Sequence, residues 1–90
     1  MRARITRPYA RPLEDRADGE DRVKAESPEA LEVIAPRYGV SPVALLSWIS
    51  DGRTDGTGQR HWLDGAHRPL VGWMTSVAAL DRFRAAVAVG

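Results

Sequence analysis

The sequence predicts a small, mainly α-helical domain with one β-hairpin, preceded by a short N-terminal arm. Ser-Pro dipeptides mark two helix starts, and apolar residues recur at helical spacing after each of them and again near the C-terminus. A pair of short runs rich in aromatic and branched residues, with Gly and Pro between them, is typical of a hairpin. With 90 residues, the chain is long enough for one such domain.

The formal net charge of +1 is unevenly distributed along the chain. Residues 1–11 carry four arginines and no acid, residues 12–26 carry six acids and three basic residues, and residues 27–90 carry six of each sign. A neutral folded part argues against a histone-like protein that binds nucleic acid through bulk charge. Any binding of DNA must therefore depend on a few placed arginines and on the basic arm.

Residues 1–26 are expected to form a flexible arm, basic over 1–11 and acidic over 12–26. Sizeable apolar residues are few there and follow neither a strand nor a helix period, so the segment buries too little surface to offset the entropy of ordering. The folded domain is then predicted to span residues 27–90. Because no run of about 18 apolar residues is present, we expect no membrane span and a cytoplasmic protein.

The first predicted helix of the domain contains a proline that conflicts with a regular helix. Ser27 and Pro28 are suited to the N-cap and first turn. Pro36 removes a backbone hydrogen bond and clashes with the preceding turn, so we expect a helix that is kinked or starts late. Gly39 is expected to end the helix in a left-handed cap.

Two further helices have clear starts. Ser41-Pro42 begins a helix over 42–50, and Thr75-Ser76 caps a helix over 77–89. Their buried sides are predicted to carry Leu45, Trp48 and Ile49 in the former and Leu80, Phe83 and Val87 in the latter. Only about three residues separate the helix over 42–50 from the one before it, which is the spacing of a helix-turn-helix.

The segment between these two helices predicts a loop followed by the hairpin. Residues 53–59 are polar and rich in glycine, which indicates a flexible loop. The hairpin strands are placed near residues 61–63 and 71–73, with the turn at 65–69.

Two stretches of the chain carry a family resemblance. They consist of Tyr38-Gly39-Val40-Ser41-Pro42 with Leu45 and Trp48-Ile49, and of Val71-Gly72-Trp73-Met74-Thr75-Ser76 with Ala79-Leu80 and Phe83. In this order and spacing, they resemble the winged helix-turn-helix of the excisionase and MerR-type DNA-binding families, over residues 31–86. The resemblance implies a double-stranded DNA-binding protein with helix 42–50 in the major groove and the hairpin as a wing on phosphate or in the minor groove. Such a protein would be associated with the nucleoid when bound.

The candidate DNA-binding residues fall into three groups. The exposed side of helix 42–50 and its start offer Ser41, Val43, Ala44, Leu46 and Ser47. The loop and wing offer Arg53, Gln59, Arg60, His61, His67 and Arg68, and the arm offers Arg2, Arg4, Arg7 and Arg11. The helix has no Arg, Lys, Asn or Gln, so its apolar residues are restricted to contacts such as those with thymine methyl groups.

An alternative remains open on the same fold. Val43 and Leu46 are exposed and apolar, so the domain could instead be an adaptor that docks them on a larger protein. As an excisionase or small regulator, it would act in recombination or transcription, with an integrase or another copy of itself as cooperative partner. We expect no enzyme, cofactor or metal, because Cys is absent and His61 and His67 have no carboxylates at a familiar metal spacing.

Overall fold

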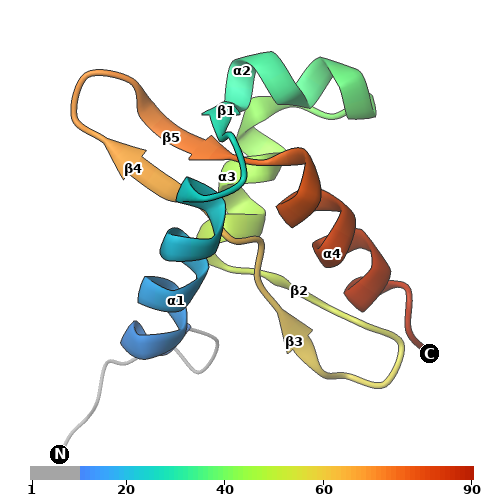
Figure 1. The fold of residues 1–90 in the computed structure, drawn as a ribbon. Coiled ribbons are helices and arrows are strands. Elements are labelled where there is room, and N and C mark those ends of the chain that lie inside the picture. The colour runs from blue at the N-terminus through green and yellow to red at the C-terminus, as the bar shows by residue number, and fades with distance from the viewer. Residues whose placement is uncertain (1–10) are drawn as a thin grey trace, which may run out of the picture.

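Ten secondary-structure elements follow one another in residues 11–90, the part of the chain that the structure, a computed structural model, describes (Figure 1). In chain order they are α1 (Leu13–Lys24), β1 (Glu29–Ala30), α2 (Leu31–Ile34), the 3-10 helix η1 (Ala35–Tyr38), α3 (Pro42–Ser50), β2 (Arg53–Thr54), β3 (Arg60–His61), β4 (Ala66–Arg68), β5 (Gly72–Thr75) and α4 (Val77–Val87). They form a small α+β fold. The predicted arm contacts Arg2, Arg4 and Arg7 lie outside the described residues. No helix within residues 11–90 is long and apolar enough to cross a membrane.

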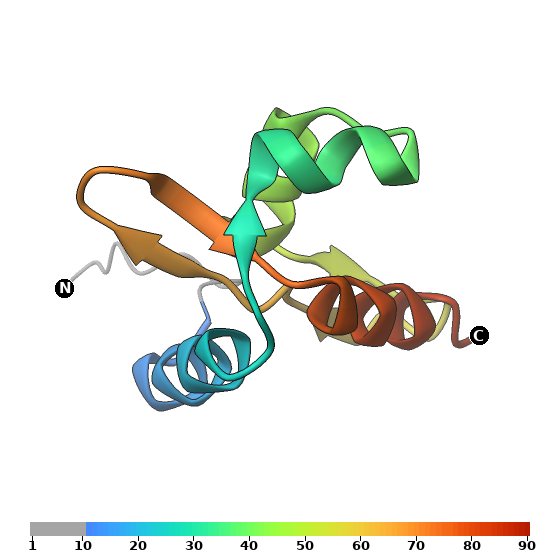
Figure 2. The same ribbon diagram turned by 45° about the horizontal axis from the view of Figure 1, so that its top comes forward.

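Two small antiparallel sheets connect the helices. The first has the strand order β1-β5-β4, with Glu29 opposite Thr75 and His67 opposite Trp73. The second is the hairpin β2–β3. Figures 1 and 2 show the β4–β5 hairpin projecting from the body on the side opposite α4, whereas β2–β3 lies beside α4.

The core contains residues from every helix. Its buried apolar members are Val23, Leu31, Ile34, Ala35, Leu45, Ile49, Leu63, Ala66, Ala79, Leu80 and Phe83. Trp48 is half-buried against this cluster, with its ring stacked on that of Phe83 at a centroid distance of 5.3 Å. The predicted buried sides of α3 and α4 are therefore confirmed, with Trp48 and Val87 only partly buried at the edge of the core.

Helix α1 contradicts the expectation of a flexible arm over residues 12–26. The Val23 side chain is 0% exposed, and Gly19 leaves no room for a Cβ beside the Asp64 carboxylate. Arg22 holds the helix to Asp64 through an ion pair. Periodicity missed this helix because a single large apolar side chain and a distant ion pair anchor it.

The start of the next helix also differs from the prediction. Ser27 is not an N-cap: its φ of 55° is left-handed, and the following residues pair with β5 as strand β1. The helix starts late, at Leu31, as Pro36 indicated. The chain changes to the 3-10 helix η1 at Ala35, which places Pro36 in a first turn where its missing N–H needs no partner. Gly39 has the predicted left-handed conformation, with a φ of 67°.

The predicted single hairpin is replaced by two. Residues 53–59, expected to be a flexible loop, form β2 and the turn that leads into β3. Asp55 stabilises this turn by accepting hydrogen bonds from the Thr57 N–H at 2.7 Å and the Gln59 N–H at 3.1 Å. Strands of two residues are too short to show a period-2 pattern, and the glycines therefore suggested a loop.

The second hairpin is shifted along the chain. Strand β4 lies within the predicted turn, and Leu63, expected in a strand, is fully buried in the segment before it. Gly65 is required for packing, because a Cβ there would lie 2.7 Å from Ile49 Cδ1. The turn is made by residues 69–71 instead.

The N-caps of α3 and α4 give a matched stability prediction. Ser41 Oγ accepts from the Ala44 N–H at 3.1 Å, and Ser76 Oγ accepts from the Ala79 N–H at 2.9 Å. Ser76 is buried and also donates to Glu26 Oε1 at 2.8 Å. We expect Ser76→Ala to reduce the free energy of unfolding by about 2 kcal/mol and Ser41→Ala by about 1 kcal/mol, measured by urea denaturation. Equal losses would show that the Glu26 contact contributes nothing.

Candidate nucleic-acid interface

The outward side of α3 is apolar and uncharged. Val43 is 75% exposed and Leu46 39% exposed, whereas Ala44 is half-buried. Ser47 is exposed beside them, and the Ser50 hydroxyl donates to the Ser47 carbonyl oxygen at 3.4 Å. The helix phase predicted from the sequence is therefore confirmed for Val43, Leu46 and Ser47, whereas Ala44 is at the edge of this surface. Ser41 is at the start of the helix, where its hydroxyl serves as the cap.

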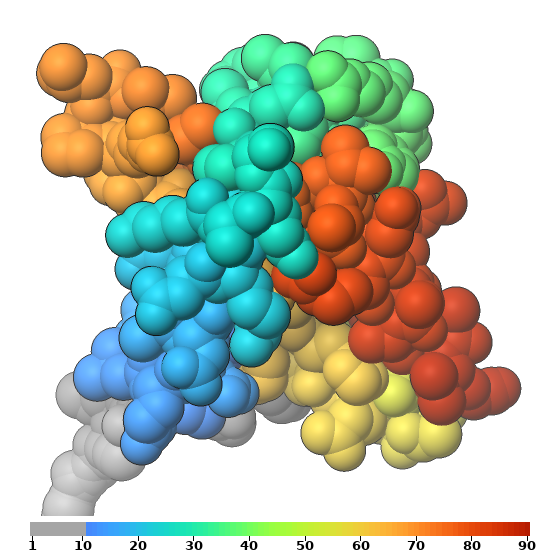
Figure 3. Space-filling model, in the orientation of Figure 1, coloured from blue at the N-terminus to red at the C-terminus, as the bar shows by residue number. Residues whose placement is uncertain are grey.

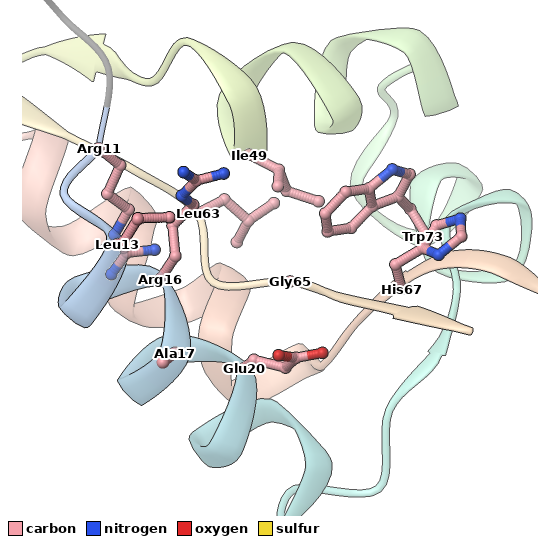
Figure 4. A pocket seen from close by; sticks show the side chains of 10 residues that line it. All are labelled: Arg11, Leu13, Arg16, Ala17, Glu20, Ile49, Leu63, Gly65, His67 and Trp73. Carbon is pink, nitrogen blue, oxygen red and sulfur yellow. The ribbon is translucent and has the colours of Figure 1, made fainter. Parts of the chain in front are cut away.

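A groove connects this surface with the β4–β5 hairpin. It consists of two adjacent cavities of about 290 Å³ and 350 Å³ between α1, α3 and the hairpin. Their linings share Arg11, Arg16, Ile49 and Trp73. In Figure 4, the side chains of Ile49 and Leu63 lie in the middle of the first cavity, with Trp73 on one side of them and Arg16 on the other. Leu46 lines the second cavity. The outward side of α3 thus continues onto one face of the hairpin.

The β4–β5 hairpin stands away from the rest of the molecule in the space-filling view (Figure 3). His67 and Arg68 are exposed on β4, and the His67 ring contacts the Trp73 ring edge-on at 5.3 Å between centroids. At the tip, Leu70 is 100% exposed. His67 and Trp73 therefore face the groove that leads to α3, whereas Arg68 is on the opposite face of β4 and Leu70 is at the tip of the hairpin.

The other predicted wing residues lie on the second hairpin, β2–β3, and have structural contacts there. Arg60 Nη1 donates to the Asp51 carbonyl oxygen at 2.8 Å, and the Arg53 guanidinium lies 5.7 Å from the centroid of the Trp48 ring. His61 Nε2 is 2.8 Å from Asp55 Oδ2. Gln59 is exposed in the turn that precedes His61. The structure therefore does not bring the predicted wing residues together: it divides them between two hairpins.

Asp55 is held in its charged form by this second hairpin. Hydrogen bonds from the Thr57 side chain and from His61 hold the pKa of Asp55 well below its ordinary value, against the opposing effect of burial. The Asp55–His61 pair thus fixes the turn and accounts for His61 without a ligand. His67 is on the other hairpin, and within residues 11–90 no group of three His, Asp or Glu side chains is placed to hold a metal ion.

An ion cluster around the buried Asp64 was not predicted from the sequence. The Asp64 side chain is 8% exposed and receives Arg11 Nη2 at 2.8 Å, Arg22 Nε at 3.2 Å and Arg82 Nη2 at 3.0 Å. Arg11, predicted as an arm contact to DNA, is therefore part of the folded domain. The one signal in the sequence was an acid within the otherwise uncharged run between His61 and Ala66.

The arginines determine the ionisation of this cluster. Burial by itself would raise the pKa of Asp64, but hydrogen bonds from Arg22, Arg11 and Arg82 outweigh it and hold the pKa below its ordinary value. Hydrogen bonding by Arg82 likewise lowers the pKa of Glu26, which also accepts the Ser76 hydroxyl. The cluster links α1, α4 and the segment before β4, so its role is structural.

No protein-family model matches this chain, and neither a curated protein nor a solved structure matches it. The structure itself defines the class of the fold. It is a small α+β domain with a short turn between η1 and α3 and a projecting β4–β5 hairpin.

Proposed function

We propose that the protein binds double-stranded DNA as a winged helix-turn-helix of the excisionase or MerR type. The observation that carries the proposal is the juxtaposition of the outward side of α3 with the β4–β5 hairpin, joined through Leu46 and Trp73 along the groove. In such a domain, one helix enters the major groove while a neighbouring element contacts the backbone. Helix α3 has the required exposed side, and the hairpin projects next to it.

The turn before α3 supports the same proposal. Gly39 adopts a left-handed conformation, and α3 begins three residues later. The preceding segment, α2 with η1, therefore packs closely against α3, which has Leu45 and Ile49 inward and Val43 outward. A recognition helix needs this combination of one buried side and one free side.

Charge near the proposed interface is sparse. His67 and Arg16 are the basic side chains in the lining of the groove, together with Arg11, which is engaged by Asp64. Glu20 and Asp51 are the acidic ones, and Arg68 is on the opposite face of β4 from His67. Few phosphate contacts mean modest affinity with a shallow salt dependence for one copy. Cooperation with a second copy or with an integrase bound to adjacent DNA would then supply the remaining affinity.

A charge-reversal pair tests the proposal. Duplex sites are first selected from random DNA at about 50 mM salt, and binding is then measured across a salt series. We expect Arg68→Glu to weaken binding at least about tenfold and to lower the salt slope by about 1, since it removes one phosphate contact. Arg84→Glu makes the same charge change on α4, the helix opposite the hairpin, and is expected to have a much smaller effect on DNA binding. Its own effect on stability, through the guanidinium that lies 5.3 Å from the centroid of the Tyr38 ring, is measured separately.

The proposal fails if the wild-type protein retains no duplex. The proposed contact between the β4–β5 hairpin and DNA is rejected if Arg68→Glu and Arg84→Glu weaken binding equally, because the effect then reflects net charge alone. Thermal unfolding of each variant establishes that it is folded.

One observation favours a second candidate, an adaptor that docks on a larger protein. Leu46 and Trp73 line an apolar groove, and Val43 is exposed next to it. If Leu46→Asp abolishes a protein interaction while Arg68→Glu leaves that interaction intact, the adaptor is supported. If Leu46→Asp leaves every protein interaction intact, the adaptor is rejected.

A further inference from the structure

The outward side of α3 offers few groups that can form hydrogen bonds to a base. The Ser41 hydroxyl caps the helix, and the Ser50 hydroxyl bonds to the preceding turn. No residue between Pro42 and Ser50 carries a charge or an amide side chain. The exposed Ser47 hydroxyl remains as the one polar group positioned in the middle of this surface.

The same surface presents two large apolar side chains close together. Val43 and Leu46 are three positions apart on the helix, so their Cβ atoms lie about 5–6 Å from each other. Both are exposed, and an apolar side chain projecting from a helix gains free energy only when a partner covers it. In the major groove of DNA, the apolar group available for this is the C5-methyl group of thymine.

We infer that α3 selects duplex sites by the C5-methyl groups of pyrimidines, with Val43 and Leu46 in contact with them. The inference rests on the proposed function and gives it a substrate class: sites with thymines, or 5-methylcytosines, under α3. Neighbouring base pairs are about 3.4 Å apart, so two side chains at this spacing cover methyl groups on about two successive base pairs. Ser47 lies beside them as the hydrogen-bonding group.

Uracil provides the direct test, because it lacks only the methyl group of thymine. A site selected by the wild-type protein is resynthesised with deoxyuridine in place of each thymine in turn, and the dissociation constant is measured. Burial of one methyl group corresponds to about a fourfold change in affinity, so each contacted thymine should give a loss of this size. At a position where α3 accepts either pyrimidine, replacement of cytosine by 5-methylcytosine adds a methyl group. The methylated duplex should therefore bind more tightly than the unmethylated one by a similar factor.

Substitutions on α3 show which surface reads the methyl groups. Val43→Ser removes both methyl groups of a side chain that is 75% exposed, so the fold tolerates it, and Leu46→Ser removes the apolar end of the second side chain. For each variant, the compared duplexes carry thymine or uracil at the position that the substituted side chain contacts. The variant should bind these two duplexes with nearly equal affinity. Val77→Ala removes a side chain of α4 that is 39% exposed, the same fraction as Leu46, and should keep the full fourfold preference.

Two results would overturn this inference and leave the proposed function standing. One is that wild-type binding is unchanged by uracil at every position. The other is that Val43→Ser and Leu46→Ser retain the full preference for thymine, because another part of the protein then makes the methyl contacts. Failure of the wild-type protein to retain any duplex rejects the proposed function itself, and this inference with it.

Discussion

Asp64→Asn is expected to reduce the free energy of unfolding by about 3 kcal/mol, the low end of the range for a buried ion pair, because Arg22 and Arg82 are close to half exposed. The substitution keeps the size of the side chain but removes its charge. Arg11, Arg22 and Arg82 are then left facing one another around a neutral amide. Because a domain of this size has roughly 5–10 kcal/mol of stability in total, urea denaturation followed by circular dichroism will show a large shift of the midpoint.

The matched control is Asp18→Asn. Asp18 is an exposed carboxylate on α1, and its removal makes the same change in net charge. We expect a loss within about 0.5 kcal/mol for this surface substitution. Equal losses for the two variants would mean that the Asp64 cluster adds nothing beyond net charge.

The pH dependence of stability provides a second readout of Asp64→Asn. The pKa values of Asp64 and Glu26 are lower in the folded protein than their ordinary values of 3.8 and 4.5. Their contribution to stability is therefore complete above about pH 5 and is lost as the pH falls through the folded pKa values. The wild-type protein should lose stability steeply below about pH 4, and Asp64→Asn should show a flatter curve because one of the two groups is gone.

The parts of the fold that were predicted correctly are those encoded by neighbouring residues. The caps Ser41 and Ser76 and the left-handed Gly39 are local signals, since each depends on the conformation of two or three residues. The apolar stripe of α3 is local too, and it placed Val43 and Leu46 on the outward side of the helix.

The errors concern contacts between distant residues. Asp64 joins Arg22 across 42 positions, and nothing near either residue indicates the pair. The prediction of Ser27 as a cap is wrong because the residues after it pair as β1 with β5, more than 40 residues away. A strand of two residues has no detectable period, so the sequence near Ser27 does not indicate this pairing. For the same reason, the wing residues were assigned to one hairpin although Arg60 and Arg68 are on different ones.

Ala17→Pro is the second substitution with a large expected effect, and it tests α1 directly. Ala17 is exposed in the interior of α1, so the change removes no buried side chain. Proline there eliminates a backbone hydrogen bond and clashes with the preceding turn, which costs about 3 kcal/mol. We expect a loss of this size in urea denaturation and a weaker helical signal in circular dichroism.

The comparison with Ala17→Gly separates an integral helix from a flexible arm. In a folded α1, glycine should cost about 1 kcal/mol, one-third of the effect of proline. In a flexible arm, neither substitution would change the midpoint, because the unfolded and folded states would pay the same conformational cost at this position. A loss with proline also means that Val23 and Arg22 are no longer held in place, since α1 brings the first into the core and the second to Asp64. Asp64→Asn combined with Ala17→Pro should then cost less than the sum of the two single losses, because both changes remove the same Arg22 contact.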